Sequence, residues 1–370
     1  MMTKRIAWCL VAAVVAAGPV AAEVVYYPSS DGINLLKHVN TATGQLDTKV
    51  EWVEDAMTNS GRVEYNAFHA IDAGTYQTQV NYNNQSNSTN AASLRFELAT
   101  PQAIGTLTQY MGDIPDKYQV WGFNEIDGTW TNLSGGWRAG SATITTNVNG
   151  TYKYIQLDYV GTPNHYIRVG EVIASPMAGA QIALTDGYNL LAYRPVLEGP
   201  GGPGPIPTSD PLYYSGWRIG HNPNDLVNNQ WNNGMLVQEN IEGNAGKENF
   251  FVLPLNDLYS LIGFATGAYH GQQWSGITIQ YTADATISET TQWFTAYTQS
   301  TSIGSASIAF TNKQGEATPI DARFIRVITP TLTSGNGALT GFELYATSIP
   351  EPATMGLLAL GGLALLRRRK

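Results

Sequence analysis

Apolar and polar residues alternate in short segments along most of the chain, and turn residues separate these segments. A period of two places apolar side chains on one face of a β-strand and polar ones on the other. Between the two ends, no stretch of about 12 or more residues has helical spacing. The pattern predicts an all-β fold of antiparallel sandwiches or jelly rolls. The clearest segments are Leu94–Leu98, Tyr118–Phe123, Ala142–Val148, Tyr152–Tyr159, Ile277–Tyr281, Ala306–Phe310 and Phe324–Ile328.

The chain contains an internal repeat. Ser30–Leu36 (SDGINLL) recurs as Thr185–Leu191 (TDGYNLL), 155 residues later. Four further matches follow in the same order, and the offset grows slowly along the chain. Loop insertions in the second copy produce such growth, so the order predicts a duplication. The further matches are 103–105 with 261–263, 128–131 with 291–294, 154–157 with 324–327, and 170–173 with 341–344.

The repeat divides the chain into two predicted domains, residues 23–176 and residues 177–347, which we call the first half and the second half. The Pro/Gly-rich stretch 198–211 has the composition of an interdomain linker. Because it follows the repeated motif of the second copy, we predict a long loop inside the second half instead.

The N-terminus has the features of a signal peptide, predicted as residues 1–22. Lys4 and Arg5 precede an apolar run, and small residues at Val20–Ala22 favour cleavage by signal peptidase before Glu23. An N-terminal membrane anchor is the alternative. The single cysteine, Cys9, lies inside this segment, so the mature chain contains none and cannot form a disulfide.

The C-terminal segment, residues 348–370, has three parts in a fixed order. A Pro-Glu-Pro turn comes first and cannot continue a helix. The apolar run 353–366 spans about 21 Å as a helix, which is marginal for crossing a membrane. The terminal cations favour the cytoplasmic side. A buried C-terminal helix is the alternative. The residues of the turn and of the basic cluster are Pro350, Glu351, Pro352, Arg367, Arg368, Arg369 and Lys370.

This order of parts resembles the PEP-CTERM sorting signal of Gram-negative bacteria, over residues 348–370 only. The resemblance implies that a membrane-embedded exosortase recognises and processes the tail. It implies an exported protein of the cell envelope, outer surface or extracellular matrix, held by the C-terminal helix before processing. The family is associated with bacteria that make extracellular polysaccharide.

The net charge of the chain limits the classes of partner that it is expected to bind. It carries 20 Lys and Arg against 29 Asp and Glu, and the two targeting segments hold six of these cations and one of these acids. Residues 23–347 therefore carry 14 cations against 28 acids, a formal charge of −14. Such an acidic surface disfavours nucleic acid and anionic lipid as partners.

Each half resembles the galactose-binding-like jelly roll of the discoidin, or coagulation factor 5/8 type C, superfamily. Residues 189–196 (NLLAYRPV) resemble its opening strand, and residues 96–130 resemble its central strands and the loop before an edge tryptophan. Residues 323–344 resemble its closing pair, whereas residues 45–90 depart from the pattern. The resemblance implies ligand binding, often of sugars, by loops at one end of the sandwich.

Sugar binding needs flat aromatic faces beside hydrogen-bonding groups. For Trp130 and Trp293 we expect packing at the edge or in the core. For Trp217 and Trp274 packing and ligand contact are both open. The candidate carbohydrate-binding residues are Trp217, His221, Tyr269, His270, Trp274, Trp52 and His69.

The same resemblance implies a structural calcium ion, held by an early Asp and a Glu near the last strand. In the first half Asp72 and Glu171 fit this role. Glu343 fits in the second half, where Asp225 or Asn228 would replace the early Asp.

Catalysis has little support in the sequence. The five histidines show no metal-binding spacing, and no nucleophile elbow or phosphate loop is present. The carboxylates Glu239, Glu242 and Asp257 stay open as an acid pair, because such pairing is spatial. The leading hypothesis is a non-catalytic exported protein that binds extracellular polysaccharide. The alternatives are a structural surface protein that binds other proteins, and a glycan hydrolase or lyase.

Overall fold

The computed structural model describes most of the chain between the two targeting segments. The described residues are 33–53, 78–81, 91–161, 166–191, 207, 210–215, 236–238, 249–268, 276–300, 306–312, 314–329 and 337–347.

The described residues of the first half contain one short 3-10 helix and ten strands. They are η1 (Leu35–Lys37), β1 (Val39–Asn40), β2 (Gln45–Leu46), β3 (Lys49–Trp52), β4 (Thr78–Asn81), β5 (Ala92–Asp113), β6 (Lys117–Asn124), β7 (Thr129–Asn132), β8 (Arg138–Ala139), β9 (Thr143–Val160) and β10 (Tyr166–Pro176).

The second half contains eight strands in its described residues. They are β11 (Tyr214–Ser215), β12 (Leu236–Gln238), β13 (Asn249–Ala268), β14 (Ile277–Thr282), β15 (Phe294–Gln299), β16 (Ala306–Ala309), β17 (Ile320–Thr329) and β18 (Gly337–Thr347).

The all-β prediction is confirmed, and every described strand pair is antiparallel. The segments predicted from alternation coincide, within a residue at each end, with parts of β5, β6, β9, β14, β16 and β17. The alternation identified them because one face of each strand is buried and the other is polar.

The two halves have the same strand order. The main path of hydrogen-bonded neighbours is β4-β10-β5-β9-β6-β7 in the first half and β12-β18-β13-β17-β14-β15 in the second. In addition, β3 pairs with β5, as β11 pairs with β13. The two halves differ in one added strand, since β8 pairs with β6 whereas β16 pairs with β13. The shared main path agrees with the duplication that the sequence predicts.

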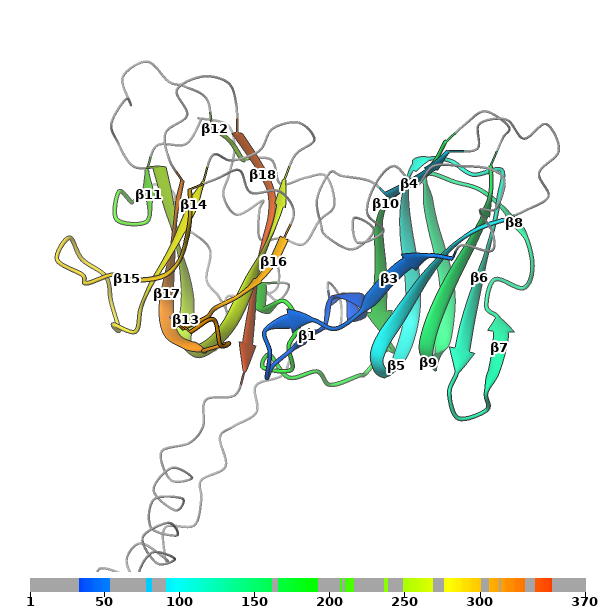
Figure 1. The fold of residues 1–370 in the computed structure, drawn as a ribbon, viewed down its shortest axis with the longest axis horizontal. Helices are drawn as coiled ribbons and strands as arrows, with labels where there is room; N and C mark the ends of the chain where they lie inside the picture. The colour runs from blue at the N-terminus through cyan, green and yellow to red at the C-terminus, as the bar shows by residue number, and fades with distance from the viewer. Residues whose placement is uncertain are drawn as a thin grey trace, which may run out of the picture. The chain divides into compact units, whose positions relative to one another are not determined.

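Two long strands hold the first half together (Figure 1). The register between β5 and β9 shifts between Glu97 and Gln102. Before the shift β5 pairs on its other side with β3, and after it with β10. Each long strand therefore belongs to both layers of a sandwich, and the chain bends where the register shifts.

The second half repeats this device. The register between β13 and β17 shifts between Pro254 and Tyr259. Before the shift β13 pairs with β11, and after it with β18 and β16. A proline fits this place because it has no backbone N–H to donate to a ladder.

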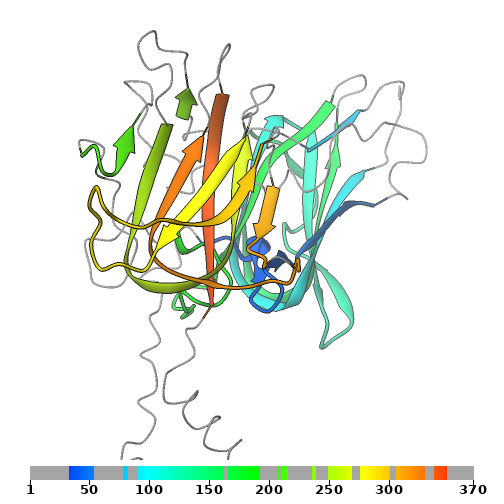
Figure 2. The same cartoon turned by 60° about the vertical axis from the view of Figure 1, so that its left-hand side comes forward.

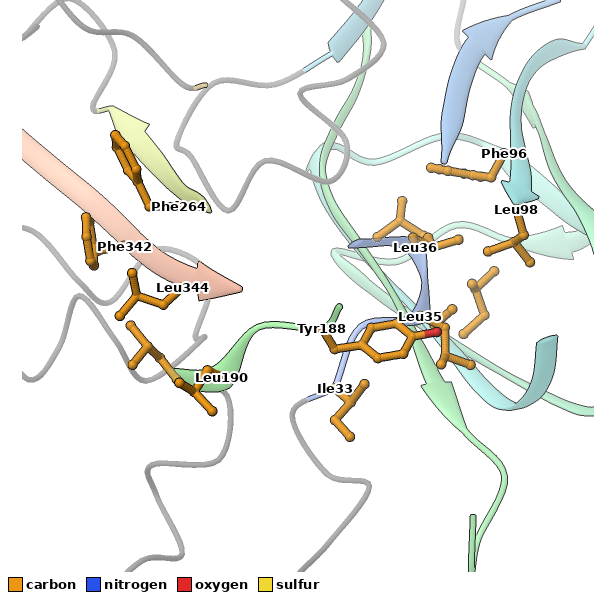
Figure 3. Packing of buried hydrophobic residues seen from close by; sticks show 14 of the residues in the cluster. Ile33, Leu35, Leu36, Phe96, Leu98, Tyr188, Leu190, Phe264, Phe342 and Leu344 are labelled. Carbon is orange, nitrogen blue, oxygen red and sulfur yellow. The ribbon is translucent and has the colours of Figure 1, made fainter. Parts of the chain in front are cut away.

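The core is one continuous cluster of buried apolar side chains from both halves (Figure 3). Along β5, Leu94, Phe96 and Leu98 are fully buried at alternate positions. In the second half Phe264 stacks on Phe342 with ring centroids 5.9 Å apart. Burial of each such side chain stabilises the fold by about 1.5–3 kcal/mol.

Asn34, in the repeated motif, joins the beginning of the first half to its last strand. Its Oδ1 accepts hydrogen bonds from the backbone N–H of Leu36 (3.1 Å) and of Ala174 (3.0 Å). Its Nδ2 donates to the carbonyl of Val172 (2.8 Å). One buried side chain thus caps η1 and ties it to β10, the last strand of the half.

Asn189, the equivalent residue of the second half, does the same. Its Oδ1 accepts from the backbone N–H of Leu191 (3.0 Å) and of Leu344 (3.2 Å). The repeated Asn-Leu-Leu is therefore a device for closing each half, which is why it is the best-preserved part of the repeat.

The predicted boundary at residues 176 and 177 falls at the end of β10. Residues 26–347 nevertheless form one compact unit. The division into two domains stays a prediction, and the contacts that join the halves are described below.

We predict that Asn34→Ala lowers the free energy of unfolding of the mature chain by about 2–3 kcal/mol, because it leaves buried backbone groups without partners. Urea unfolding measures this change. Asn40→Ala is the control, because the Asn40 Oδ1 accepts from Ala42 N and Thr43 N in an exposed turn, where water can replace it. The capping account is wrong if both variants lose the same small amount.

Candidate functional site

Outward-pointing side chains of four adjacent strands in the first half form a polar and aromatic surface, which we call the outer face. On β5, β6 and β9 they alternate with buried apolar positions, whereas β7 has no buried residue; Ser93 and Asp158 are covered by their neighbours, at 8% and 6% exposed. The outer face consists of Ser93, Arg95 and Glu97 on β5, Tyr154, Gln156 and Asp158 on β9, Gln119, Trp121 and Phe123 on β6, and Trp130 and Asn132 on β7.

The strand register sorts these residues into rows across the sheet. One row contains Arg95, Gln156, Trp121 and Asn132. Cross-strand neighbours on one face lie close enough for side-chain contact, so each row forms a connected set. The next row, on the side of the β6–β7 hairpin, runs Glu97, Tyr154, Phe123, Trp130.

Asp158 is the centre of the polar part. Its carboxylate accepts four side-chain hydrogen bonds, from Ser93 Oγ (2.6 Å), Gln156 Nε2 (2.8 Å), Trp121 Nε1 (2.8 Å) and Gln119 Nε2 (2.9 Å). Hydrogen bonds to a charged acceptor are stronger than neutral ones, so this carboxylate holds its four neighbours in fixed orientations.

The aromatic part of the outer face surrounds Trp130. Its ring lies 5.4 Å from Phe123 and 6.3 Å from Tyr154, between centroids. The Arg95 guanidinium lies over it, 5.4 Å from the centroid. Trp130 is nevertheless 40% exposed, so part of a large aromatic surface faces solvent. The expectation of edge packing holds only in part, because packing leaves this much of the ring open.

Arg95 links the two parts of the outer face. Its Nε and Nη2 donate to Gln156 Oε1 at 3.0 and 2.7 Å. Gln156 in turn donates to Asp158. The arginine is thus held over Trp130 by the same network that Asp158 anchors, and within the described chain its Nη1 makes no hydrogen bond.

Tyr159 lies on the opposite side of β9, fully buried, and donates from its hydroxyl to Gln109 Oε1 (2.7 Å). Burial, and next the Asp158 charge, raise the pKa of Tyr159 well above its ordinary value. The hydroxyl therefore stays protonated and remains a donor under the outer face.

The corresponding surface of the second half carries different chemistry. The register places Ile328 where the first half has Asp158, and Arg326 where it has Gln156. The Arg326 guanidinium lies over the rings of Phe250 (4.1 Å) and Trp293 (5.8 Å). An arginine over an edge tryptophan is common to both halves, whereas the central carboxylate belongs to the first half.

Most of the predicted sugar-binding residues lie outside the described residues. Trp52 is described, and it is buried (8% exposed) on the inward side of β3 with its ring 6.5 Å from Tyr159. It offers no face to a sugar, because its position in the strand points into the core. The predicted residues outside the described part are Trp217, His221, Tyr269, His270, Trp274 and His69.

Two of the predicted calcium ligands contact a lysine. Lys37 Nζ lies 3.3 Å from Glu171 Oε1 and 2.9 Å from Glu343 Oε1, and all three side chains are buried. These carboxylates would have to exchange the ammonium for a metal ion. Asp72 lies outside the described residues, so the calcium site stays a prediction.

The described residues hold no group of three or more His, Cys, Asp or Glu arranged for a metal ion. Of the carboxylates considered for glycan cleavage, Asp257 is exposed and pairs with Arg323 (3.4 Å). Glu239 and Glu242 lie outside the described part, so the expectation of no catalysis stays a prediction.

Sequence reasoning missed the outer face. The alternation in 94–98, 118–123 and 152–159 does show which side chains point outward, and most of those residues are polar or aromatic. It does not show which strands are neighbours. Only the pairing of β9 between β5 and β6 brings Arg95, Asp158 and Trp121 together.

Comparison with protein families addresses the tail. Residues 348–370 match the PEP-CTERM protein-sorting motif. The predicted sorting tail is therefore confirmed, and it makes this an exported protein that an exosortase sorts to the cell envelope. No helix in the described part of the chain is long and apolar enough to cross a membrane, and the tail itself lies outside that part.

No curated protein matches the chain. Similar solved structures include an F-lectin from striped bass serum (13% identity, covering 88% of this chain and 100% of the lectin, TM-score 0.29). They also include the CBM32-1 and CBM32-2 domains of Clostridium perfringens ZmpB (10%, 84% and 94%, TM-score 0.28). A third is the family 32 carbohydrate-binding module of Clostridium perfringens NanJ, solved with galactose (16%, 36% and 97%, TM-score 0.29).

We predict that Asp158→Asn lowers the free energy of unfolding by about 2 kcal/mol, because an amide NH₂ then faces donors that had a carboxylate oxygen. Near-ultraviolet circular dichroism should also change as Trp121 loses its acceptor. The control is Asp127→Asn on the exposed β6–β7 turn, where the carboxylate accepts only from Asn124. Equal effects in the two variants would contradict the central role of Asp158.

Proposed function

We propose that the protein is a non-catalytic component of the cell envelope that binds extracellular polysaccharide, with the outer face of the first half as one binding surface. The observation that carries this proposal is the exposed ring of Trp130 beside an ordered network of amide, guanidinium and carboxylate groups. The sorting tail supports it, because the motif is one of export to the cell envelope and its family is associated with bacteria that make extracellular polysaccharide.

The chemistry of the outer face suits a sugar. An aromatic ring covers the C–H side of a pyranose, and the neighbouring polar groups hydrogen-bond its hydroxyls. Trp130 provides the ring, and the Arg95 guanidinium lies over it. Within the described residues, the Nη1 of Arg95 makes no hydrogen bond. Because Asp158 fixes Gln156, and Gln156 fixes Arg95, the donors are ordered before a ligand arrives, which lowers the entropy lost on binding.

An open sheet face fits a polymer better than a small free sugar. Trp130 lies on β7, at the end of the sheet path, so a chain of sugars can lie across the edge without meeting a wall. The predicted loop residues Trp217 and Trp274 would add a second contact in the other half. A structural calcium ion at Asp72 and Glu171 is the corresponding proposal for a cofactor.

A protein-binding role is the second candidate, and one observation favours it. Ile126, at the tip of the β6–β7 hairpin, is 89% exposed, so its apolar side chain is available for contact with another protein. Binding that Ile126→Asp abolishes and Trp130→Ala spares would support this role instead.

We predict that Trp130→Ala weakens binding of purified host exopolysaccharide by at least about tenfold, since loss of the ring removes its burial and stacking energy. Titration calorimetry of the mature chain, residues 23–347, with calcium present, measures this. Trp137→Ala is the matched control, because Trp137 is 42% exposed and has no ring contact within the described chain.

Two results would contradict the proposal that the outer face binds polysaccharide. Failure of the mature chain to bind any glycan on an array, with calcium present, removes the proposed function altogether. Equal weakening by Trp130→Ala and Trp137→Ala removes the assignment of the site. Trp217→Ala and Trp274→Ala in the same titration test the loops separately.

We predict that replacing Arg367, Arg368 and Arg369 by alanine keeps the protein from reaching its normal envelope location in the host, because cations set the orientation of the tail. Fractionation of cells that carry a tagged copy measures this. Normal delivery of a copy that lacks residues 348–370 would show that the tail is not the address.

A further inference from the structure

The two halves meet around one buried lysine. Lys37 belongs to the first half, and its ammonium contacts Glu171 of the same half and Glu343 of the second half, at 3.3 and 2.9 Å. Lys37 is only 4% exposed. Tyr345 adds a hydrogen bond from its hydroxyl to the second carboxylate oxygen of Glu343. The charge that neutralises the Glu343 carboxylate thus comes from across the joint.

Apolar contacts surround this lysine. Val39 packs with Ile262 and Tyr345 in a small buried cluster separate from the main core. A Cβ added to Gly44 would lie 2.7 Å from the Cβ of Ala309. Residues 33–46, comprising η1, β1 and β2, therefore lie against β13, β16 and β18, and we call this segment the N-terminal strap. In Figures 1 and 2 the strap (blue) runs beside β16 (orange).

The strap also contacts the start of the second half. Val39 N donates to the carbonyl of Gly187 (2.8 Å), and the His38 ring meets Tyr188 edge-on, with centroids 5.0 Å apart. A Cβ on Gly187 would lie 2.1 Å from Val39 O, so only glycine fits. Figure 3 shows Tyr188 pointing toward Leu35 of the strap, whereas Leu190 lies beside Leu344.

Comparison of the two halves shows that only the first half carries the residues of the strap that form this joint. At the offset of the repeated motif, the second half has Ala192 where the first has Lys37, and Arg194 where it has the buried Val39. The second half therefore has no lysine at the position equivalent to Lys37. An interface between two unlike surfaces builds open chains if every copy carries both surfaces. If only one copy carries the first surface, the assembly stops at a pair.

We propose that the N-terminal strap is a docking element whose partner is the second half of the same chain, with Lys37 as the residue that decides the pairing. This inference does not depend on the ligand. The strap joins the two halves within one compact unit, and the pairing stops at two halves because the position equivalent to Lys37 in the second half is Ala192.

Lys37 should decide the pairing of the halves because a buried charge without a partner is unfavourable. Removing one member of a buried ion cluster strongly destabilises it, because its partners stay buried without compensation. Loss of Lys37 would leave the Glu171 and Glu343 carboxylates facing each other without the ammonium between them. Each half keeps its own strand ladders, so we expect the loss of Lys37 to act on the joint between the halves rather than on either sheet.

The test cuts the chain and asks whether the halves stay together. A protease site is inserted between Gly179 and Ala180, where the chain is in an exposed turn and a Cβ on Gly179 would meet nothing within 4 Å. The full mature chain is folded first, then cut, diluted and passed over a sizing column. Circular dichroism before and after cutting reports whether each half keeps its sheets.

We expect the cut wild-type halves to elute together at micromolar concentration. Lys37→Met should raise their apparent dissociation constant at least about a hundredfold. The control is Lys49→Met, which removes an exposed ion pair with Glu97 inside the first half and should leave the halves together.

A second pair of variants tests the joint without changing a charged residue. It keeps the test valid if Lys37→Met does not fold. Gly44→Ala places a methyl group against Ala309 and should separate the cut halves. Gly128→Ala imposes similar backbone strain, with φ of +63° against +66°, but its methyl meets nothing within 4 Å, so the halves should stay paired.

Separation of the wild-type halves on cutting would overturn the proposal. So would cut Lys37→Met or Gly44→Ala halves that stay paired as tightly as the controls. Glycan titration of the uncut Lys37→Met chain distinguishes this proposal from the proposed function, because binding at the outer face should persist when the joint fails.

Discussion

The backbone pairing of β5 with β9 is the constraint on which the first half depends, and β13 with β17 repeats it in the second. The chain has a single cysteine, Cys9, so no disulfide within the chain can tie the layers of a sandwich together. Long strands that pass from one layer to the other do this instead, with the core between them. The same pair sets the outer face, because Arg95 and Asp158 come from these two strands.

The two halves share one strand order but carry different side chains at the positions that form their surfaces. Both halves keep the strand order, the asparagine that closes the sandwich and an arginine over an edge tryptophan. They differ at the position of Asp158, where the second half has Ile328, and at Lys37, where it has Ala192. The first difference gives one half an anchored polar network, and the second fits a joint that forms only once. The duplication therefore kept what folds a sandwich and changed what its surfaces do.

Much of the fold could be predicted from the sequence, because alternation, turn residues and the repeat are local or periodic signals. The strands around Phe96 and Ile325 were found in this way, and so was the sorting tail. Strand register is a tertiary property and leaves no such trace. Trp52 alternates correctly for a strand, but only register shows that its side faces the core. Glu171 was predicted as a calcium ligand near the last strand, and no local pattern shows that Lys37, 134 positions earlier in the sequence, contacts it.

The central claim is that the Trp130 ring on the outer face contacts polysaccharide. Nuclear magnetic resonance of the mature chain with ¹⁵N-labelled tryptophan tests it most directly, with indole signals assigned by single substitutions. As host exopolysaccharide is added, the Trp130 indole signal should shift until binding saturates, while that of the buried Trp52 stays in place. A Trp130 signal that does not move when the polysaccharide is bound would contradict the claim.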